Sequence, residues 1–154
     1  MNVEELIADG WRDHEQDPQG VHDSLAGSAM RVSNDVQLQA FSRLLTHVHA
    51  EHLNNRGAGV SVLDQLRVRF EPGARAAYRP ATTSIAILHF IDGDAAALDP
   101  LTSEERASAL ATAASALAWH QQLDQALTLF QPAVREAASR QVAWPRPSTA
   151  PSDA

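Results

Sequence analysis

The chain of 154 residues contains no cysteine, and aromatic residues make up only 5% of it. The absence of cysteine excludes disulfides, thiolate metal sites and cysteine nucleophiles, and it fits a reducing compartment. Lysine is missing too, so all 12 basic residues are arginine. Together with abundant alanine, this bias is typical of a GC-rich bacterial genome and carries no information about function.

Long hydrophobic runs are also missing. No apolar stretch approaches the roughly 20 residues that span a bilayer. The first eleven residues carry Glu4, Glu5 and Asp9 but no basic side chain, so we expect no signal peptide. The sequence predicts a cytoplasmic protein whose length suffices for one domain with its own core.

Positive charge is scarce, with a formal net charge of −7 and an isoelectric point near 5.4. Phosphate backbones and anionic lipids repel such a chain, which argues against nucleic-acid and membrane partners. The sequence contains no nucleophile elbow, phosphate loop or dinucleotide fingerprint. We therefore predict neither an enzyme activity nor a cofactor.

The clearest pattern that is present covers residues 102–140. Thr102 and Glu105 have the spacing of a capping box, and apolar or small residues then recur every three or four positions on both sides of a turn at 120–122. Two amphipathic helices joined by so short a turn pack antiparallel and need neighbours to bury their faces. The residues that set this spacing are Leu110, Ala113, Ala114, Leu117, Leu123, Ala126, Phe130 and Ala133.

These positions resemble those of a tetratricopeptide-type repeat. The resemblance implies stacked antiparallel helical hairpins, in which small residues allow close helix approach and larger ones fill the gaps between hairpins. It also implies a concave surface that accepts a peptide or a helix of a partner. Pro132 lies inside the second helix and predicts a kink near Gln131, at a cost of about 3 kcal/mol in a regular helix.

Looser copies of the same unit are predicted earlier in the chain. Helices are expected up to about residue 15, from Pro18, over about 35–53 and from 59 to 70, with a degenerate pair at 85–92 and 95–98. Gly20, Gly59 and Ala126 would be equivalent small positions. No segment alternates with period two, so the prediction is an all-α, tetratricopeptide-like stack of seven or eight helices over residues 1–141. Residues 142–154, rich in Pro, Ser and Ala, are predicted to be a flexible tail.

The segment 46–52 is rich in histidine and resembles an inverted zinc-protease motif. At about 100° per residue, an α-helix places His47 and Glu51 on one edge, His49 on the far edge and His52 in the apolar face. Ligands spread in this way cannot close one tetrahedral site, so we predict no metal. His14, His52 and His120 are interpreted instead as structural residues near helix ends. The alternative is a small metal- or ligand-dependent enzyme built on His47, His49, Glu51 and His52.

Four arginines gather around a predicted turn at 71–73: Arg67, Arg69, Arg75 and Arg79. One interpretation is a contact site for an anion or an acidic partner, because guanidinium groups grip carboxylates and phosphates. The other is a solvated face balanced by Glu71 and Asp64.

The sequence thus favours a non-enzymatic protein-interaction module whose partner is another protein or a peptide. A helical-repeat secretion chaperone and an immunity-type inhibitor of a toxin both fit this class. A third hypothesis is self-association into a homodimer through Trp119 and the stripe at Leu127 and Phe130.

Overall fold

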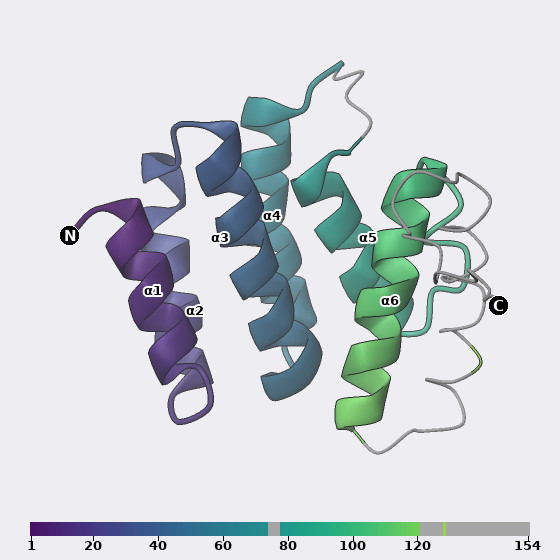
Figure 1. Cartoon of the computed structure of the whole chain (residues 1–154), viewed down its shortest axis with the longest axis horizontal. Coiled ribbons are helices and arrows are strands. Elements are labelled where there is room, and N and C mark those ends of the chain that lie inside the picture. Colours follow the sequence, from purple (N-terminus) through teal and green to yellow (C-terminus); the bar gives the residue numbers. More distant parts are fainter. Residues whose placement is uncertain (74–77, 121–127, 129–154) are drawn as a thin grey trace, which may run out of the picture.

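The computed structural model describes residues 1–73, 78–120 and 128, and within them it contains six α-helices and no strand (Figure 1). The helices are α1 (Val3–Asp13), α2 (Pro18–Ser28), α3 (Asp35–His47), α4 (Arg56–Phe70), α5 (Pro80–Ile91) and α6 (Ser103–Trp119). A 3-10 turn at Ala29–Arg31 follows α2, and a π-helical turn at Val48–His52 follows α3. The all-α prediction is confirmed. Several predictions lie outside the described residues: Arg75, the helix predicted after residue 120 with Ala126, Leu127, Phe130 and Ala133, and the tail boundary at 141.

In four of the six described helices, the side chain of the N-cap residue itself caps the first turn. Asn2 accepts a hydrogen bond from the backbone of Glu5, and Thr102 does the same for Glu105, each within a complete capping box. Asp17 caps α2 through Gly20 N, with Pro18 following it, and Asn34 caps α3 through Gln37 N. The starts predicted at Pro18, at 35 and after Thr102 are confirmed.

The helices run in two directions. In Figure 1, α1 and α3 descend, and α2 and α4 return behind them. The next two helices, α5 and α6, both descend in Figure 1, and a hydrogen bond between Arg79 and Glu105 shows that they start at the same end of the molecule. The end of α6 meets the end of α3, where Nε2 of His120 lies 2.9 Å from the carbonyl oxygen of Ala50. Helices α5 and α6 are therefore parallel and do not form a hairpin.

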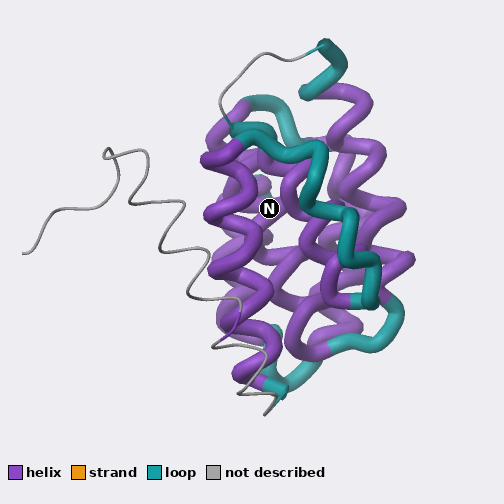
Figure 2. The backbone as a smooth tube through the Cα atoms, turned by 90° about the vertical axis from the view of Figure 1, so that its right-hand side faces the viewer, coloured by secondary structure: helices purple, strands orange, loops and turns teal. Residues whose placement is uncertain are grey.

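The prediction of a short helix at 95–98 is wrong. Residues 92–102 instead form a series of turns that runs back up the side of the helices (Figure 2). Gly93 adopts φ 107°, and the Asp94 side chain accepts a hydrogen bond from Ala96 N. Such local side-chain bonds compete with helix formation, and Pro100 cannot continue a helix. The predicted degenerate unit thus contributes one helix, α5, and a non-helical return.

The main core lies mostly among α1–α5 and contains the largest fully buried apolar side chains, and a smaller cluster joins α5 to α6. The main cluster includes Leu25, Leu38, Phe41, Leu44, Leu45, Leu63, Leu66 and Leu88. The second includes Ile87, Leu98, Leu101, Ala109 and Leu110. The predicted repeat positions Leu110 and Ala114 are buried, and Leu117 is half-buried. Packing of α6 thus depends on α5 and on the return segment.

Two glycines mark close approaches between elements. A Cβ on Gly59 would lie 2.6 Å from Cδ2 of the His49 ring, and one on Gly10 would lie 2.5 Å from Cδ2 of Leu44. The three atoms nearest to a Cβ on Gly20 would all belong to the carboxylate of its own cap, Asp17. The predicted equivalence of Gly20 and Gly59 is therefore wrong: Gly20 serves a helix start, whereas Gly10 fills the close-approach role in α1.

None of the described helices combines the length and the apolar character that crossing a bilayer requires.

Candidate functional site

An open groove lies between α3 and α6, with α5 as its floor. Its volume is about 610 Å³, and residues from α1 and the π-helical turn close one end. The face that α6 presents to it consists of Ser108, Ala111, Thr112 and Ser115, which occupy positions i, i+3, i+4 and i+7 of the helix. Because all four side chains are small, they leave open space between α6 and α3.

The groove lining mixes apolar and polar surface, the apolar part being slightly larger, and it carries little net charge. Hydroxyl groups come from α3, α5 and α6, and Gln39 and Arg43 lie on the α3 wall. Trp11 and Tyr78 supply aromatic surface, and Tyr78 lies 3.3 Å, oxygen to oxygen, from Ser108. Glu51 and His47 stand at the end where the π-helical turn begins. Such a lining suits a ligand with many hydrogen-bonding groups and little formal charge.

Three histidines from separate turns meet at that end of the groove. One ring nitrogen from each of His14, His47 and His52 lies within 4.8 Å of the others. The ring centroid of His14 lies 4.9 Å from that of His47 and 5.2 Å from that of His52. The centroids of His47 and His52 are 5.4 Å apart. All three side chains are half-buried.

The π-helical turn brings His47 and His52 to one side, contrary to the sequence prediction. In an α-helix, five steps of about 100° would separate them by roughly 140°. Here Leu53 N donates to the carbonyl oxygen of Val48, five residues back, which widens the turn. The α-helical projection was therefore wrong for this pair. His14, which was interpreted as purely structural, joins them from the end of α1.

His47 and Glu51 do share one edge, as predicted, with Nδ1 of His47 2.7 Å from Oε2 of Glu51. Burial lowers the pKa of His47, and the neighbouring His14 lowers it further. The pKa of His52 is also lowered, by burial and then by His47 and His14. Burial raises the pKa of Glu51. Both shifts favour the neutral imidazole, whose unprotonated nitrogen can bind a ligand.

His49 points away from this cluster, as the sequence predicted. It is fully buried, and its Nε2 lies 2.7 Å from Nδ1 of His22 in α2. Arg56 donates from Nε to the His49 carbonyl oxygen and forms an ion pair with Asp92. His49 therefore belongs to the helix packing and not to the groove.

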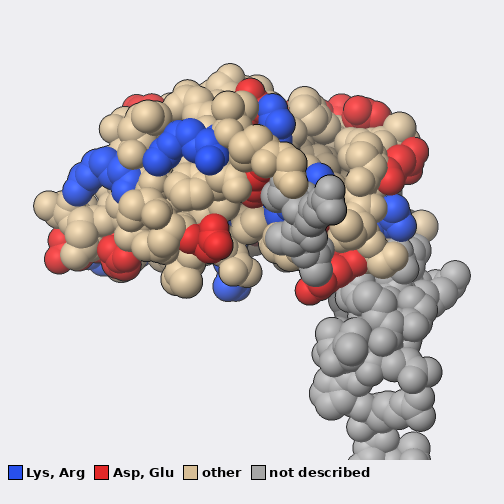
Figure 3. All heavy atoms as spheres, turned by 90° about the horizontal axis from the view of Figure 1, so that it is seen from above, with Lys and Arg blue, Asp and Glu red and all other residues tan. Residues whose placement is uncertain are grey.

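Two arginines of the predicted contact site, Arg67 and Arg69, make contacts within the chain. Arg69 donates to the carbonyl oxygens of Ala29 and Val32, and Arg67 pairs with Asp64 on the surface. In the view down onto this end of the molecule, arginines and acidic side chains are interspersed (Figure 3). The balancing role predicted for Asp64 is confirmed.

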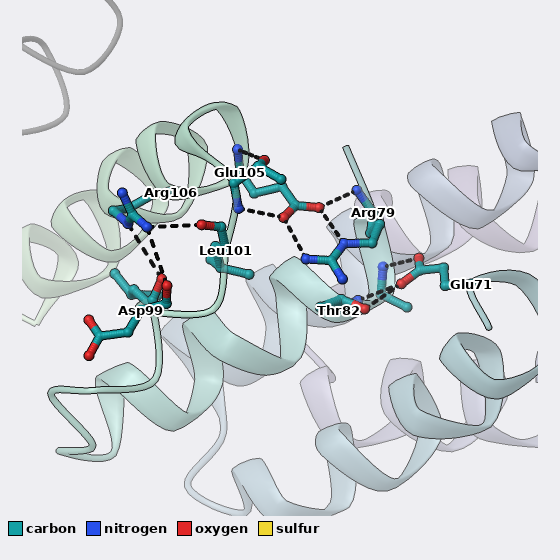
Figure 4. Close-up of polar contacts among 10 residues, drawn as sticks. Glu71, Arg79, Thr82, Asp99, Leu101, Glu105 and Arg106 are labelled. Carbon is teal, nitrogen blue, oxygen red and sulfur yellow. Dashed lines mark hydrogen bonds and ion pairs between the residues drawn. The ribbon is translucent and has the colours of Figure 1, made fainter. Parts of the chain in front are cut away.

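Arg79 and Glu71 hold the starts of α5 and α6 instead of facing solvent (Figure 4). The fully buried Glu105 accepts hydrogen bonds from the Arg79 backbone and guanidinium at 2.7–2.9 Å. Glu71 accepts from the backbones of Ala81 and Thr82 and thereby caps α5. Sequence analysis missed this network, although the residue pattern Glu-Pro-Gly before Pro80 marks the region as a connection.

Trp119, a predicted partner-binding residue, is 53% exposed at the end of α6. Its ring centroid lies 5.2 Å from that of His52, so it adjoins the histidine cluster. The arrangement thus offers a hydrogen-bonding groove and, at its end, a set of imidazole nitrogens. Comparisons with models of protein families, with curated proteins and with solved structures found no match to this chain.

Proposed function

We propose that the chain is a non-enzymatic helical scaffold that binds an extended segment of another protein in the groove between α3 and α6. The observation that carries this proposal is the run of small side chains Ser108, Ala111, Thr112 and Ser115 along one wall of a 610 Å³ groove. A polypeptide backbone can approach such a wall closely, and hydroxyl groups can pair with its amides and carbonyls. An extended segment offers one donor and one acceptor per residue, which matches this lining.

A tetratricopeptide-type stack is the architecture we propose for this scaffold. The directions of the helices support it, since α1, α3, α5 and α6 descend while α2 and α4 return. The return segment 92–102 takes the place of one ascending helix. In stacks of this kind the helices that share a direction form a continuous surface along which a ligand can lie.

Selection from a library of random peptides tests this function on the full chain. Peptides enriched on the wild-type protein are compared for binding to two serine variants, Ser115→Arg in the groove and Ser61→Arg in α4, which does not line it. Both serines are exposed in mid-helix, so both variants should fold. We expect Ser115→Arg to weaken binding at least tenfold, or about 1.4 kcal/mol, and Ser61→Arg to leave it within twofold. Equal binding to both variants, or no enriched peptide, would contradict the proposal.

A further inference from the structure

The histidine cluster at the end of the groove has the donor set of a metal site. Imidazole nitrogens suit Zn²⁺, Ni²⁺ and Cu²⁺, whereas Mg²⁺ and Ca²⁺ require oxygen ligands. Three histidines with a vacant fourth position are one of the recurrent ligand sets of catalytic zinc. Here His14 comes from the end of α1, and His47 and His52 come from the two ends of the π-helical turn.

The spacing of the three rings is close to what such an ion needs. With Zn–N distances of about 2.0–2.1 Å, two ligands of a tetrahedral ion lie roughly 3.3 Å apart. The ligand nitrogens of the cluster lie within 4.8 Å of one another. Rotations of these half-buried side chains about χ1 and χ2 can close the remaining gap.

In two of these histidines one ring nitrogen already faces a hydrogen-bond acceptor. Nδ1 of His14 lies 2.6 Å from the carbonyl oxygen of Trp11, and Nδ1 of His47 lies 2.7 Å from the Glu51 carboxylate. A carbonyl oxygen and an ionised carboxylate only accept, so each Nδ1 carries the proton, and in the neutral imidazole Nε2 then keeps its lone pair. Metal-binding histidines almost always donate their other N–H to a carbonyl or carboxylate, which fixes the ring.

We propose that His14, His47 and His52 bind one divalent transition-metal ion, Zn²⁺ in the first instance, with Glu51 as the positioning residue for His47. Trp11 and Trp119 flank the cluster, with ring centroids 5.1 Å from His47 and 5.2 Å from His52 respectively. His47, Glu51 and Trp11 also line the groove. The cluster therefore adjoins the groove, so water or a carboxylate or imidazole of a bound segment would be near enough to complete the coordination of an ion held there.

Titration of the tag-free, metal-stripped full chain with Zn²⁺ tests this site, with Co²⁺ as a visible-absorbing probe of tetrahedral geometry. We expect one ion per chain. His14→Ala and His52→Ala should each weaken binding at least tenfold, and His89→Ala, at an exposed histidine of α5, should change it less than twofold. Glu51→Gln should weaken binding by roughly 10- to 100-fold. The same stoichiometry and affinity in His14→Ala, or no ion bound at micromolar concentration, would overturn the proposal.

A second measurement covers the case in which a variant does not fold. NMR spectra of the imidazole nitrogens are recorded on the wild-type protein during the Zn²⁺ titration. The chain has seven histidines, and Zn²⁺ should shift the ring resonances of His14, His47 and His52 together. Shifts confined to His89 or spread evenly over all seven would show surface binding and refute the site. Because this titration needs no peptide, its outcome is independent of the groove-binding test.

Discussion

Nε2 of His49 lies 2.7 Å from Nδ1 of His22, and this contact joins the π-helical turn to α2 inside the packed helices. His49 has no exposed surface, and its ring fills the space that the missing Cβ of Gly59 leaves open. A charge on this ring would have neither water nor an acidic partner. His22 and Arg56 face it, and both disfavour protonation.

Stability should therefore fall as pH falls through the range in which free histidine takes up a proton. Burial, with His22 and Arg56 adding to it, lowers the pKa of His49 from 6.5 to about 4. Between these values the unfolded chain binds the proton and the folded chain does not. The stabilisation is complete above pH 6.5 and is lost towards pH 4, by at most about 3 kcal/mol from this group.

Urea unfolding between pH 7 and pH 4 in metal-free buffer measures this slope. His49→Gln removes the titrating group and should flatten the dependence, whereas His89→Gln should preserve it because His89 is exposed. An unchanged slope in His49→Gln would assign the acid sensitivity to other groups.

Glu105 should be among the most costly acidic residues to remove. Its carboxylate is fully buried and binds the backbones of Thr102 and Arg79 and the guanidinium of Arg79. Burial alone would raise the pKa of Glu105, but these hydrogen bonds bring it below the ordinary value. Glu105→Ala leaves the half-buried guanidinium of Arg79 and the backbone N–H groups of Arg79 and Thr102 without their acceptor, and it should cost about 3 kcal/mol of unfolding free energy.

The matched control is the preceding residue, Glu104, which is exposed in the same first turn of α6. Its main contribution is to the helix dipole, so Glu104→Ala should cost at most about 1 kcal/mol. Chemical denaturation of both variants gives the comparison. Equal losses would show that the Arg79–Glu105 pair does not hold α5 and α6 together.

Two glycines near the start of α4 should respond in opposite directions to alanine. A Cβ at Gly57 meets nothing within 4 Å, so Gly57→Ala should stabilise by roughly 0.5–1 kcal/mol through lower chain entropy. A Cβ at Gly59 would lie 2.6 Å from the buried His49 ring, so Gly59→Ala should destabilise by about 1–3 kcal/mol. Thermal unfolding distinguishes the two, and a stabilising Gly59→Ala would show that the ring has room to move.

The helices and their starts could be predicted because their determinants are local. Asp17 before Pro18, Asn34 before Gln37, and Thr102 with Glu105 each act within one turn, and each caps the helix that was expected. The prediction of a short helix at 95–98 was wrong because it did not account for the hydrogen bond from Ala96 N to the Asp94 side chain or for the turn at Gly93, whose positive φ glycine adopts without strain. Turn chemistry decided that segment.

The sequence by itself determined an all-helical chain, its caps and the shared edge of His47 and Glu51, since each depends on residues within about one turn. Only the tertiary structure decided that His14, His47 and His52 converge, that α5 and α6 run parallel, and that Arg79 pairs with Glu105. The convergence needs a π-helical turn, which the periodicity of side chains does not encode, and a contact between α1 and α3. Such relationships arise from packing between segments distant in the chain, which no local pattern fixes.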